Sequence, residues 1–255
     1  MESLDRILAS LRDGRVSGVY VGLFWTAVVA EVQGRECCGL ASTVNEQSGH
    51  HGELPLPEAG RLGQYAALEL ASWCKSPLAL RRSIGLAAVN ALLPEPPLPW
   101  VDANAEVVLV ERGRGKKVAL VGHFPFVEQL RASAASLWVL EQNPLPGDLP
   151  AERAPEVIPQ ADIVAITGMA VVNNSLPELL AQCRPGAWVM LVGPSAPLSP
   201  VWYDYGVHWI SGARVRQPGP VVTAVMQGAS FRQIHKAGVQ LITMAVNEDL
   251  SLNQS

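Results

Sequence analysis

Short apolar runs alternate with helical patterns throughout the second half of the chain. Each run has four to six residues, as is typical of strands buried on both faces of a parallel sheet. This alternation predicts a Rossmann-like domain with a mainly parallel sheet and right-handed crossovers. We expect strands at 117–121, 137–140, 161–166 and 188–192, weaker or final strands at 207–210 and 239–246, and helices at 126–135, 175–183 and 221–228.

The start of the chain has a different pattern. An amphipathic helix is expected at 4–11, because apolar residues recur there at helical spacing. Two apolar segments, at 16–31 and 38–44, follow it and are joined by the polar turn at 33–35, which is typical of a hairpin. A helix followed by antiparallel strands predicts an α+β unit.

Two helices and a proline-rich segment complete the first half. We expect one helix over 61–73 and a second that begins at Ser76-Pro77, with Ser76 as N-cap, and runs to Asn90. The segment 94–99 holds four prolines, which cannot continue a helix, so it marks the predicted domain boundary. The pattern at 104–112 fits a helix or a strand equally well. The predicted domains are 1–98, of α+β type, and 99–255, of Rossmann-like α/β type.

Composition and charge narrow the class of protein. Charged residues make up 16% of the chain and apolar residues 49%, which excludes a disordered protein and favours a buried sheet. The formal net charge is -4 and the pI is near 5.7, so no electrostatic feature predicts nucleic-acid binding. A small-molecule partner is compatible with this charge.

No targeting or membrane segment is predicted. The first residues include Glu2 and Asp5, where a secretory signal requires basic residues. The uncharged stretch 16–30 is shorter than the roughly 20 residues of a membrane-spanning helix and is rich in β-branched and aromatic residues. We therefore expect a cytoplasmic protein without a membrane partner.

The four cysteines show no metal-binding or disulfide spacing. Cys37, Cys38, Cys74 and Cys183 contain no CxxC motif, so reduced, buried thiols are the expected state. The adjacent pair Cys37-Cys38 is the exception to keep in view. Neighbouring residues of a strand face opposite sides, so one of the two at most would face a given cavity.

Polar or glycine-containing residues follow each predicted strand of the second half. The carboxyl ends of parallel strands meet at one edge of a sheet, so residues distant in sequence should converge there. This convergence is the main sequence argument for a ligand site. The strand ends carry Gly122-His123, Glu141 with Asp148, Thr167-Gly168 with Asn173-Asn174, and Gly193-Pro194-Ser195.

His123 is the central candidate at this edge. Its near-neutral pKa as a free side chain suits a general acid/base, a metal ligand or a hydrogen-bonding clamp, and a histidine satisfied within its own turn is the alternative. Glu141 lies 18 positions later, close to the offset at which an acidic residue binds ribose in dinucleotide folds. The loop Gly122-His-Phe-Pro-Phe126 lacks G-x-G-x-x-G, which disfavours NAD and leaves adenosine or S-adenosylmethionine-like ligands open.

The other candidates have structural alternatives of their own. Asp148 lies in a Pro/Gly-rich loop where turn hydrogen bonding is as good a role as a functional one. The Asn173-Asn174 pair would either cap the next helix or hold an anion or carboxylate. Ser195 is a candidate anion-binding hydroxyl and not a nucleophile, because G-x-S-x-G is absent.

The first half carries weaker candidates. Thr26 lies on the predicted hairpin and Asn90 late in a helix, whereas Glu31 fits a salt bridge at a strand end. The pair His50-His51 could touch a metal, but a solvated loop is the more common setting for such a pair. His208 and His235 have no partner nearby in sequence and receive no role.

Several of these motifs occur together in one known family. They are Val121-Gly122-His123-Phe-Pro-Phe126, Glu141-x-x-Pro144-x-x-Gly147-Asp148-x-Pro150, Ala161-Asp162-x-Val-x-Ile-Thr167-Gly168, Asn173-x-Ser175-Leu, and Gly193-Pro-Ser195-x-Pro197-Leu-Ser-Pro200, with Trp25-Thr26-Ala27 and Gly85-x-Ala87-x-x-Asn90 in the first half. The chain resembles a prokaryotic family of unknown function linked to heavy-metal chelation. Ser175 stands where threonine is expected, and it keeps the hydroxyl.

The resemblance implies a domain similar to the enolase amino-terminal domain joined to a Rossmann-like domain, with dimers and a ligand site in the cleft between the domains. It also implies a role in metal chelation or in the synthesis of a chelator. One hypothesis is therefore an enzyme or ligand-processing protein. His123, Glu141 and Asp148 would be its catalytic groups, and its ligand-binding residues would be Gly122, Thr167, Gly168, Asn173, Asn174, Gly193, Ser195, Thr26 and Asn90.

Two further hypotheses stay open. In a metal or metal-chelate binding protein, His123, Glu141 and Asp148 would be mixed nitrogen and oxygen ligands of a divalent metal ion, although the sequence has no dense Cys/His/carboxylate cluster. In a structural or regulatory homodimer there would be no catalysis. The sequence leaves substrate, reaction and metal identity undetermined.

Overall fold

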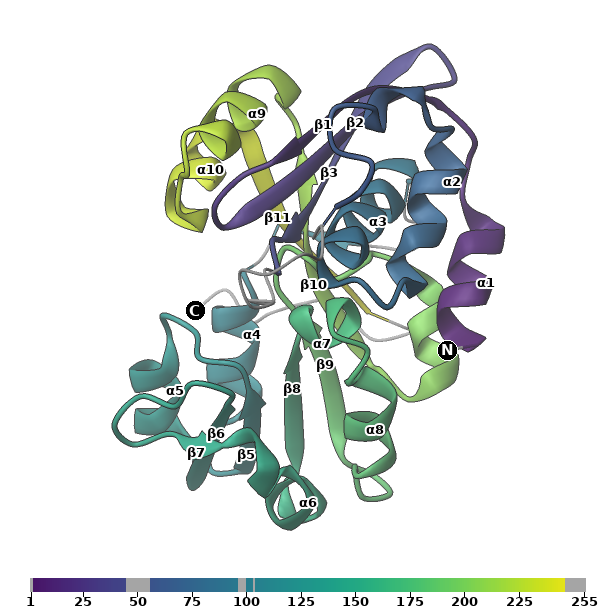
Figure 1. The fold of residues 1–255 in the computed structure, drawn as a ribbon. Coiled ribbons are helices and arrows are strands. Elements are labelled where there is room, and N and C mark those ends of the chain that lie inside the picture. Colours follow the sequence, from purple (N-terminus) through teal and green to yellow (C-terminus); the bar gives the residue numbers. More distant parts are fainter. Residues whose placement is uncertain (1, 45–55, 96–99, 103, 246–255) are drawn as a thin grey trace, which may run out of the picture.

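The computed structural model describes residues 2–44, 56–95, 100–102 and 104–245 (Figure 1). An eight-stranded sheet forms the centre of the second half, and a three-stranded antiparallel sheet lies beside its upper edge in the first half. This confirms the predicted mixed α/β fold, with a mainly parallel sheet in the C-terminal part. The predicted pair His50-His51 and most of the proline segment 94–99 lie outside the described residues.

The large sheet has the order β4-β11-β10-β9-β8-β5-β6-β7. Its six strands from β7 to β10 are parallel, and β11 and β4 add antiparallel pairs at the other edge. The strands are β4 (Trp100–Val101), β5 (Lys117–Val121), β6 (Ser136–Glu141), β7 (Leu149–Pro150), β8 (Ile163–Thr167), β9 (Trp188–Val192), β10 (Trp209–Val215) and β11 (Val239–Ala245).

Successive side chains of β5 point to opposite faces of the sheet, and the buried residues on both faces are apolar. Helices therefore cover both faces of the parallel strands. Val118 and Leu120 pack with α4 and α5, whereas Ala119 belongs to the core that α6, α7 and α8 complete. Asn104 caps α4, which settles the ambiguous segment 104–112 as helix. These helices are α4 (Ala105–Arg112), α5 (Val127–Ser133), α6 (Ala154–Val157), α7 (Met169–Val172) and α8 (Leu176–Ala181).

The small sheet corrects one expectation. The segment 16–31 is not a single strand but two, because the Gly22 N–H donates to the Trp25 carbonyl and closes a turn. An apolar turn gave no polar signal in the sequence. The strands β1 (Arg15–Val21), β2 (Trp25–Val32) and β3 (Arg35–Ser42) run antiparallel in this order, and Arg15 pairs with Glu31 at the predicted strand-end ion pair.

Elements from both halves sandwich the small sheet (Figure 1). The first-half helices α1 (Glu2–Ser10), α2 (Ala67–Ser72) and α3 (Ala79–Leu92) lie on one side, and α9 (Pro218–Met226) and α10 (Phe231–Gly238) lie on the other. The sequence reading missed α10, whose start is a capping box of Ser230 and Gln233. The helix expected from Ser76 begins instead at Ala79.

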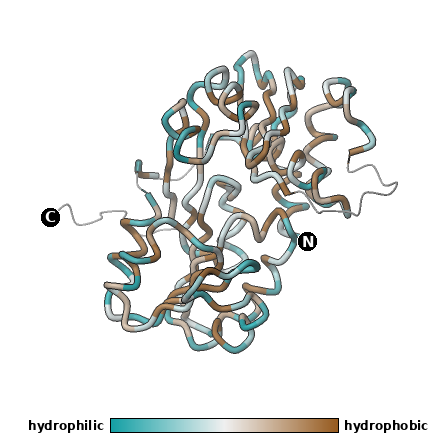
Figure 2. Tube along the Cα trace, turned by 60° about the vertical axis from the view of Figure 1, so that its left-hand side comes forward, coloured by the Kyte–Doolittle hydropathy of each residue, from teal (hydrophilic) through white to brown (hydrophobic). Residues whose placement is uncertain are grey.

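One hydrophobic cluster continues across both halves. It includes Leu4 and Leu86 from the first half and Leu191 and Ile210 from the second. In the hydropathy view, hydrophilic segments lie mostly at outer loops and helix surfaces (Figure 2). The buried guanidinium of Arg82 on α3 adds a polar link, because it donates to the Val172 carbonyl at the end of α7. The two halves therefore share a core in addition to touching at their surfaces.

Candidate functional site

The order of the parallel strands is that of a dinucleotide-binding fold. Numbered along the chain from β5 to β10, the six parallel strands follow the order 3-2-1-4-5-6. The order reverses between β5 and β8, and ligands of such sheets bind outside the carboxyl ends of the strands at this reversal. The loops after β5 and β8 carry Gly122-His123 and Thr167-Gly168, as the sequence predicted.

The loop after β5 depends on Gly122. Its φ of +102° lies in a region that side-chain-bearing residues avoid, and a Cβ there would lie 3.1 Å from the Thr167 Cβ. The glycine thus lets the ends of β5 and β8 approach each other. Pro125 lies before α5, because a turn from Phe124 to Val127 precedes the helix.

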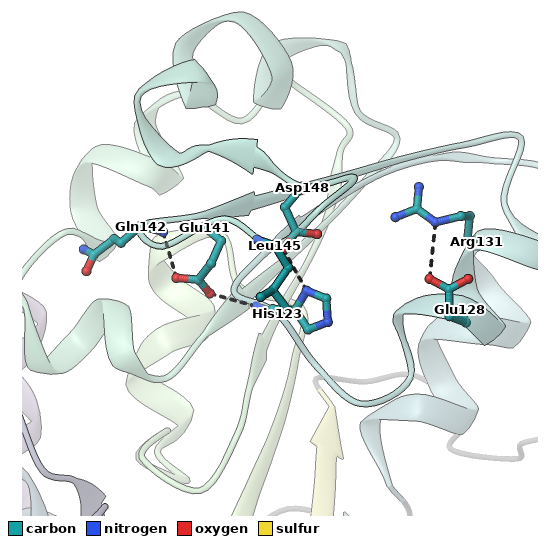
Figure 3. A network of polar contacts seen from close by, with 7 residues as sticks. All are labelled: His123, Glu128, Arg131, Glu141, Gln142, Leu145 and Asp148. Carbon is teal, nitrogen blue, oxygen red and sulfur yellow. Dashed lines mark hydrogen bonds and ion pairs between the residues drawn. The ribbon is translucent and has the colours of Figure 1, made fainter.

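His123, Glu141 and Asp148 meet at the ends of β5, β6 and the loop before β7 (Figure 3). The His123 Nδ1 lies 2.8 Å from Asp148 Oδ2, and the backbone N–H of His123 donates to Glu141 Oε2 over 2.9 Å. The Asp148 side chain is 1% exposed and also accepts the Leu145 N–H, whereas the His123 side chain is 34% exposed. A buried carboxylate therefore orients a partly exposed imidazole.

A cavity of about 430 Å³ opens beside these residues, and we call it the strand-end cavity. Its volume lies within the usual range of small-molecule sites. Three glutamates, Glu141, Glu152 and Glu178, contribute to the lining, and no described lysine or arginine does. The cavity is thus acidic. The Gln182 Oε1 on its wall is buried without a hydrogen-bond partner among the described residues.

Of the other residues predicted at the strand ends, some line the strand-end cavity and others do not. Thr167 and Asn173 line the strand-end cavity, and a Cβ on Gly193 would lie 4.0 Å from the Gly168 nitrogen, so these ends converge. Asn173 Oδ1 accepts the N–H and hydroxyl of Ser175, which is the N-cap residue of α8, and no described side chain caps the first turn of this helix. Asn174 has a φ of +61° and does not belong to the cavity lining.

Three predicted ligand-binding residues lie elsewhere. Ser195 is buried, and its hydroxyl accepts the Ser42 N–H across the contact of the two halves over 2.9 Å. Thr26 is buried and shares a hydrogen bond with Thr43. The Asn90 amide donates to the Leu40 carbonyl. These contacts give each residue a structural partner outside the strand-end cavity.

Sequence reasoning missed the wall opposite His123. Glu152 and Glu178 lie on short helical segments between β7 and β9, and Gln182 directly follows α8. Each had the sequence signature of an ordinary solvated helix face. Their only usable signal was position: the segments after β7 and β8 must return across the same edge of the sheet. The acidic character of the cavity therefore emerges only from the fold.

The fold and the cavity define a two-part α/β protein whose Rossmann-like half has a small-molecule cavity at its strand-reversal point. The chain belongs to the DUF364 family, whose profile matches residues 104–244 and is described as "Putative heavy-metal chelation". A second profile with the same description, DUF4213, matches residues 4–93.

The comparisons with individual proteins cover nearly the whole chain. A DUF364-family structure of unknown function from Desulfitobacterium hafniense is 30% identical, has a TM-score of 0.80 and aligns over 96% of this chain and 98% of its own. One from Pyrococcus horikoshii has 18% identity, a TM-score of 0.78 and the same coverage, and shows the shared fold. The uncharacterized protein MJ0500 of Methanocaldococcus jannaschii is 27% identical over 254 residues, 96% of this chain and 95% of that protein.

The side chains of the described residues do not fit a resident metal ion. No group of three or more His, Cys, Asp or Glu residues is placed to hold one within the described ranges. His123, Glu141 and Asp148 do not form such a group, because Glu141 contacts the backbone N–H of His123 and the His123 imidazole contacts Asp148. Cys38 and Cys74 are buried, and burial raises the pKa of their thiols to about 12.

None of the helices in the described part of the chain has the length and apolar character needed to span a bilayer.

Proposed function

We propose that this protein binds a nucleoside-bearing small molecule of the S-adenosylmethionine type in the strand-end cavity, with His123 placed to transfer a proton. The observation that carries the proposal is the position of Glu141, which ends the second strand of a 3-2-1-4-5-6 sheet and lines an acidic cavity. An acidic residue at this position binds ribose hydroxyls in dinucleotide folds.

The geometry of Glu141 suits this role. Its two oxygens accept the N–H groups of His123 and Gln142, which hold the carboxylate rigidly at the cavity (Figure 3). A carboxylate oxygen has two lone pairs, so each can accept a further hydrogen bond from a hydroxyl group. A ribose diol would supply two such donors.

The negative charge of the cavity lining favours an S-adenosylmethionine-type ligand over a dinucleotide. Glu141, Glu152 and Glu178 would repel phosphate groups, and the described lining has no cation to offset them. The β5 loop has one glycine where a pyrophosphate-binding loop has three, so close backbone approach to phosphates is not provided. A sulfonium or an amino group, in contrast, would be attracted to these carboxylates.

The contact between His123 and Asp148 provides the site with a group that can transfer a proton. A buried carboxylate hydrogen-bonded to Nδ1 favours the tautomer that carries its proton there, which leaves Nε2 as a base. No hydrogen bond from Nε2 to another described residue competes for it. A bound molecule could therefore exchange a proton with His123 Nε2.

This proposal bears on the chelation described for the family. A site for a nucleoside-bearing molecule fits a role in the synthesis of a chelator, which acts on an organic molecule. The proposal also puts the ligand within the second half of the chain instead of between the halves, because the cavity is lined by residues between Val121 and Gln182.

Calorimetric titration of the purified chain with S-adenosylmethionine, adenosine, NAD and ATP tests the proposal. We expect binding of the first two and weaker or no binding of NAD and ATP. Glu141→Gln should weaken S-adenosylmethionine binding by about tenfold, since a charged hydrogen-bond partner is worth roughly 1.5–3 kcal/mol. Glu128→Gln is the matched control, because Glu128 lies nearby, is exposed and pairs with Arg131 outside the cavity (Figure 3).

Two outcomes would refute the proposal. One is the absence of binding by both adenosine-bearing molecules while a phosphate-bearing nucleotide binds. The other is equal affinity of Glu141→Gln and Glu128→Gln for S-adenosylmethionine. A parallel titration with Zn²⁺, Ni²⁺ and Cu²⁺ checks direct coordination, which we expect to be absent at stoichiometric levels.

A further inference from the structure

A second cavity, of about 540 Å³, lies between the two halves of the chain. One wall comes from residues 12–95, including the β2–β3 turn and the end of α3, and the other from residues 198–216, including β10. It shares no lining residue with the strand-end cavity. We call it the arginine cavity, after its lining residues Arg12, Arg35, Arg214 and Arg216.

The charges of the arginine cavity are only partly neutralised. Arg12 donates to the neutral Gln33 and Arg216 to the neutral Gln240, whereas Arg214 pairs with Glu95. The Arg35 side chain makes no hydrogen bond or ion pair with any residue that the structure describes. Glu36 is the second acidic residue of the lining. Four arginines against two glutamates leave the walls with a net positive charge.

Glu95 forms an ion pair with Arg214 and lies in the same cavity lining as Arg35 and Arg216. The hydrogen bond from Arg214 lowers the pKa of Glu95, and the charges of Arg214, Arg216 and Arg35 lower it further. These arginines come from both halves, on β10, after β10 and on β3. Glu95 thus contacts Arg214 and shares the cavity lining with Arg35 and Arg216, whose charges also stabilise its carboxylate.

Cys37 on the first-half wall does not offset this charge. Partial burial raises the pKa of its thiol, so it is neutral at physiological pH. Its neighbour Cys38 also lines the cavity, and burial raises the pKa of that thiol to about 12. The net positive charge of the arginine cavity therefore comes from its arginines, and the cysteines do not reduce it.

We propose that the arginine cavity binds a small polyanion with at least two phosphate or carboxylate groups, and that Glu95 occupies one anion position when this ligand is absent. Guanidinium groups bind both kinds of anion through paired hydrogen bonds. The walls come from both halves, so a bound polyanion would bridge them. This site is independent of the acidic strand-end cavity, whose charge selects the opposite kind of ligand.

Titration calorimetry of the full chain with pyrophosphate and with citrate, at constant ionic strength, tests this inference. Arg35→Gln on the first half and Arg216→Gln on the second should each weaken binding about tenfold, whereas Glu95→Gln should strengthen it about tenfold, by removing the competing carboxylate. Arg232→Gln is the control: Arg232 is exposed on α10, outside both cavities, and its loss should leave affinity unchanged.

The two probes separate the ligand classes. Binding of pyrophosphate alone assigns a phosphate-bearing ligand, binding of citrate alone a polycarboxylate, and binding of both a site selective for charge. The inference is overturned if neither probe binds wild type or Glu95→Gln at millimolar concentration, or if Arg35→Gln and Arg216→Gln bind like Arg232→Gln. Urea unfolding of each variant identifies any loss that comes from misfolding, and adenosine binding by Arg35→Gln should be retained.

Discussion

Asp148 Oδ2 lies 2.8 Å from His123 Nδ1, and the aspartate side chain is almost completely buried while the histidine faces a cavity. The two residues are 25 positions apart and are brought together because the chain returns to the same sheet edge before β7. This arrangement orients an imidazole without requiring a metal ion.

The first prediction concerns the tautomer of His123. In the wild type at pH 8.5, the neutral ring should carry its proton on Nδ1, because the Asp148 carboxylate only accepts. In Asp148→Asn the new amide can donate or accept, so both tautomers should appear. Long-range ¹⁵N–¹H correlation spectra of histidine-labelled protein distinguish them. His208 is the internal control; an unchanged His123 pattern in the variant would contradict the assigned contact.

The second prediction concerns the loop after β5. Gly122→Ala should lower the free energy of unfolding by about 2–4 kcal/mol, because the new Cβ meets Thr167 and Phe124 at an unfavourable φ. Gly186→Ala is a matched control with a φ of +80° and open space around the new Cβ, so its loss should stay near 1 kcal/mol. Urea denaturation measures both, and equal losses would show that the contact with Thr167 is unimportant.

The third prediction separates a structural from a ligand-binding role for Ser195. Ser195→Ala leaves the partly buried Ser42 N–H without its acceptor, so the free energy of unfolding should fall by about 1–3 kcal/mol. Binding of S-adenosylmethionine should not change. Ser72→Ala, at an exposed hydroxyl, should have little effect on stability. A Ser195→Ala variant that keeps its stability but loses ligand affinity would restore the ligand-clamp interpretation.

The fourth prediction concerns the thiols. Burial raises the pKa of Cys38 and Cys74 to about 12 and that of Cys183 to about 11, so in the native protein these thiols should resist alkylation at pH 8. The half-buried Cys37 should react first, and unfolding in urea should expose all four. Mass spectrometry after timed iodoacetamide treatment gives the order. Rapid native labelling of Cys38 would disagree with its burial.

The same pKa shifts predict a loss of stability at alkaline pH. The folded protein keeps the Cys38 and Cys74 thiols protonated up to about pH 12, whereas in the unfolded chain they ionise near pH 9. Unfolding therefore becomes more favourable as pH rises through this window, by about 1 kcal/mol per thiol at pH 10. The double variant Cys38→Ala/Cys74→Ala should show a shallower decline between pH 8 and pH 10 in urea denaturation. A decline as steep as that of the wild type would contradict this linkage.

The alternation of apolar runs and helical patterns in the second half was enough to predict the parallel sheet, since buried parallel strands have a distinct composition. Lys117–Val121, Ile163–Thr167 and Trp188–Val192 form close to their expected bounds. The same reading failed for 16–31, where an apolar turn hides a hairpin, and for α10, a helix of eight residues with few apolar positions. An apolar turn conceals the boundary between two strands, and a short helix offers too few repeats for its period to be recognised.

The candidate site was also predicted from the sequence only in part. The sequence alone placed His123, Glu141, Asp148 and Thr167 at one sheet edge, because the carboxyl ends of parallel strands must converge. It could not separate Ser195, which contacts Ser42, from residues that face the strand-end cavity.

What the sequence by itself determined was the edge at which a ligand would bind, because strand direction and period are local properties of the chain. Only the tertiary structure decided the charge of each cavity. Glu178 reaches the strand-end cavity because α8 packs on the sheet, and Arg35 and Arg214 share the arginine cavity because the two halves meet. Electrostatic character depends on which side chains converge in space, and long-range packing sets that convergence.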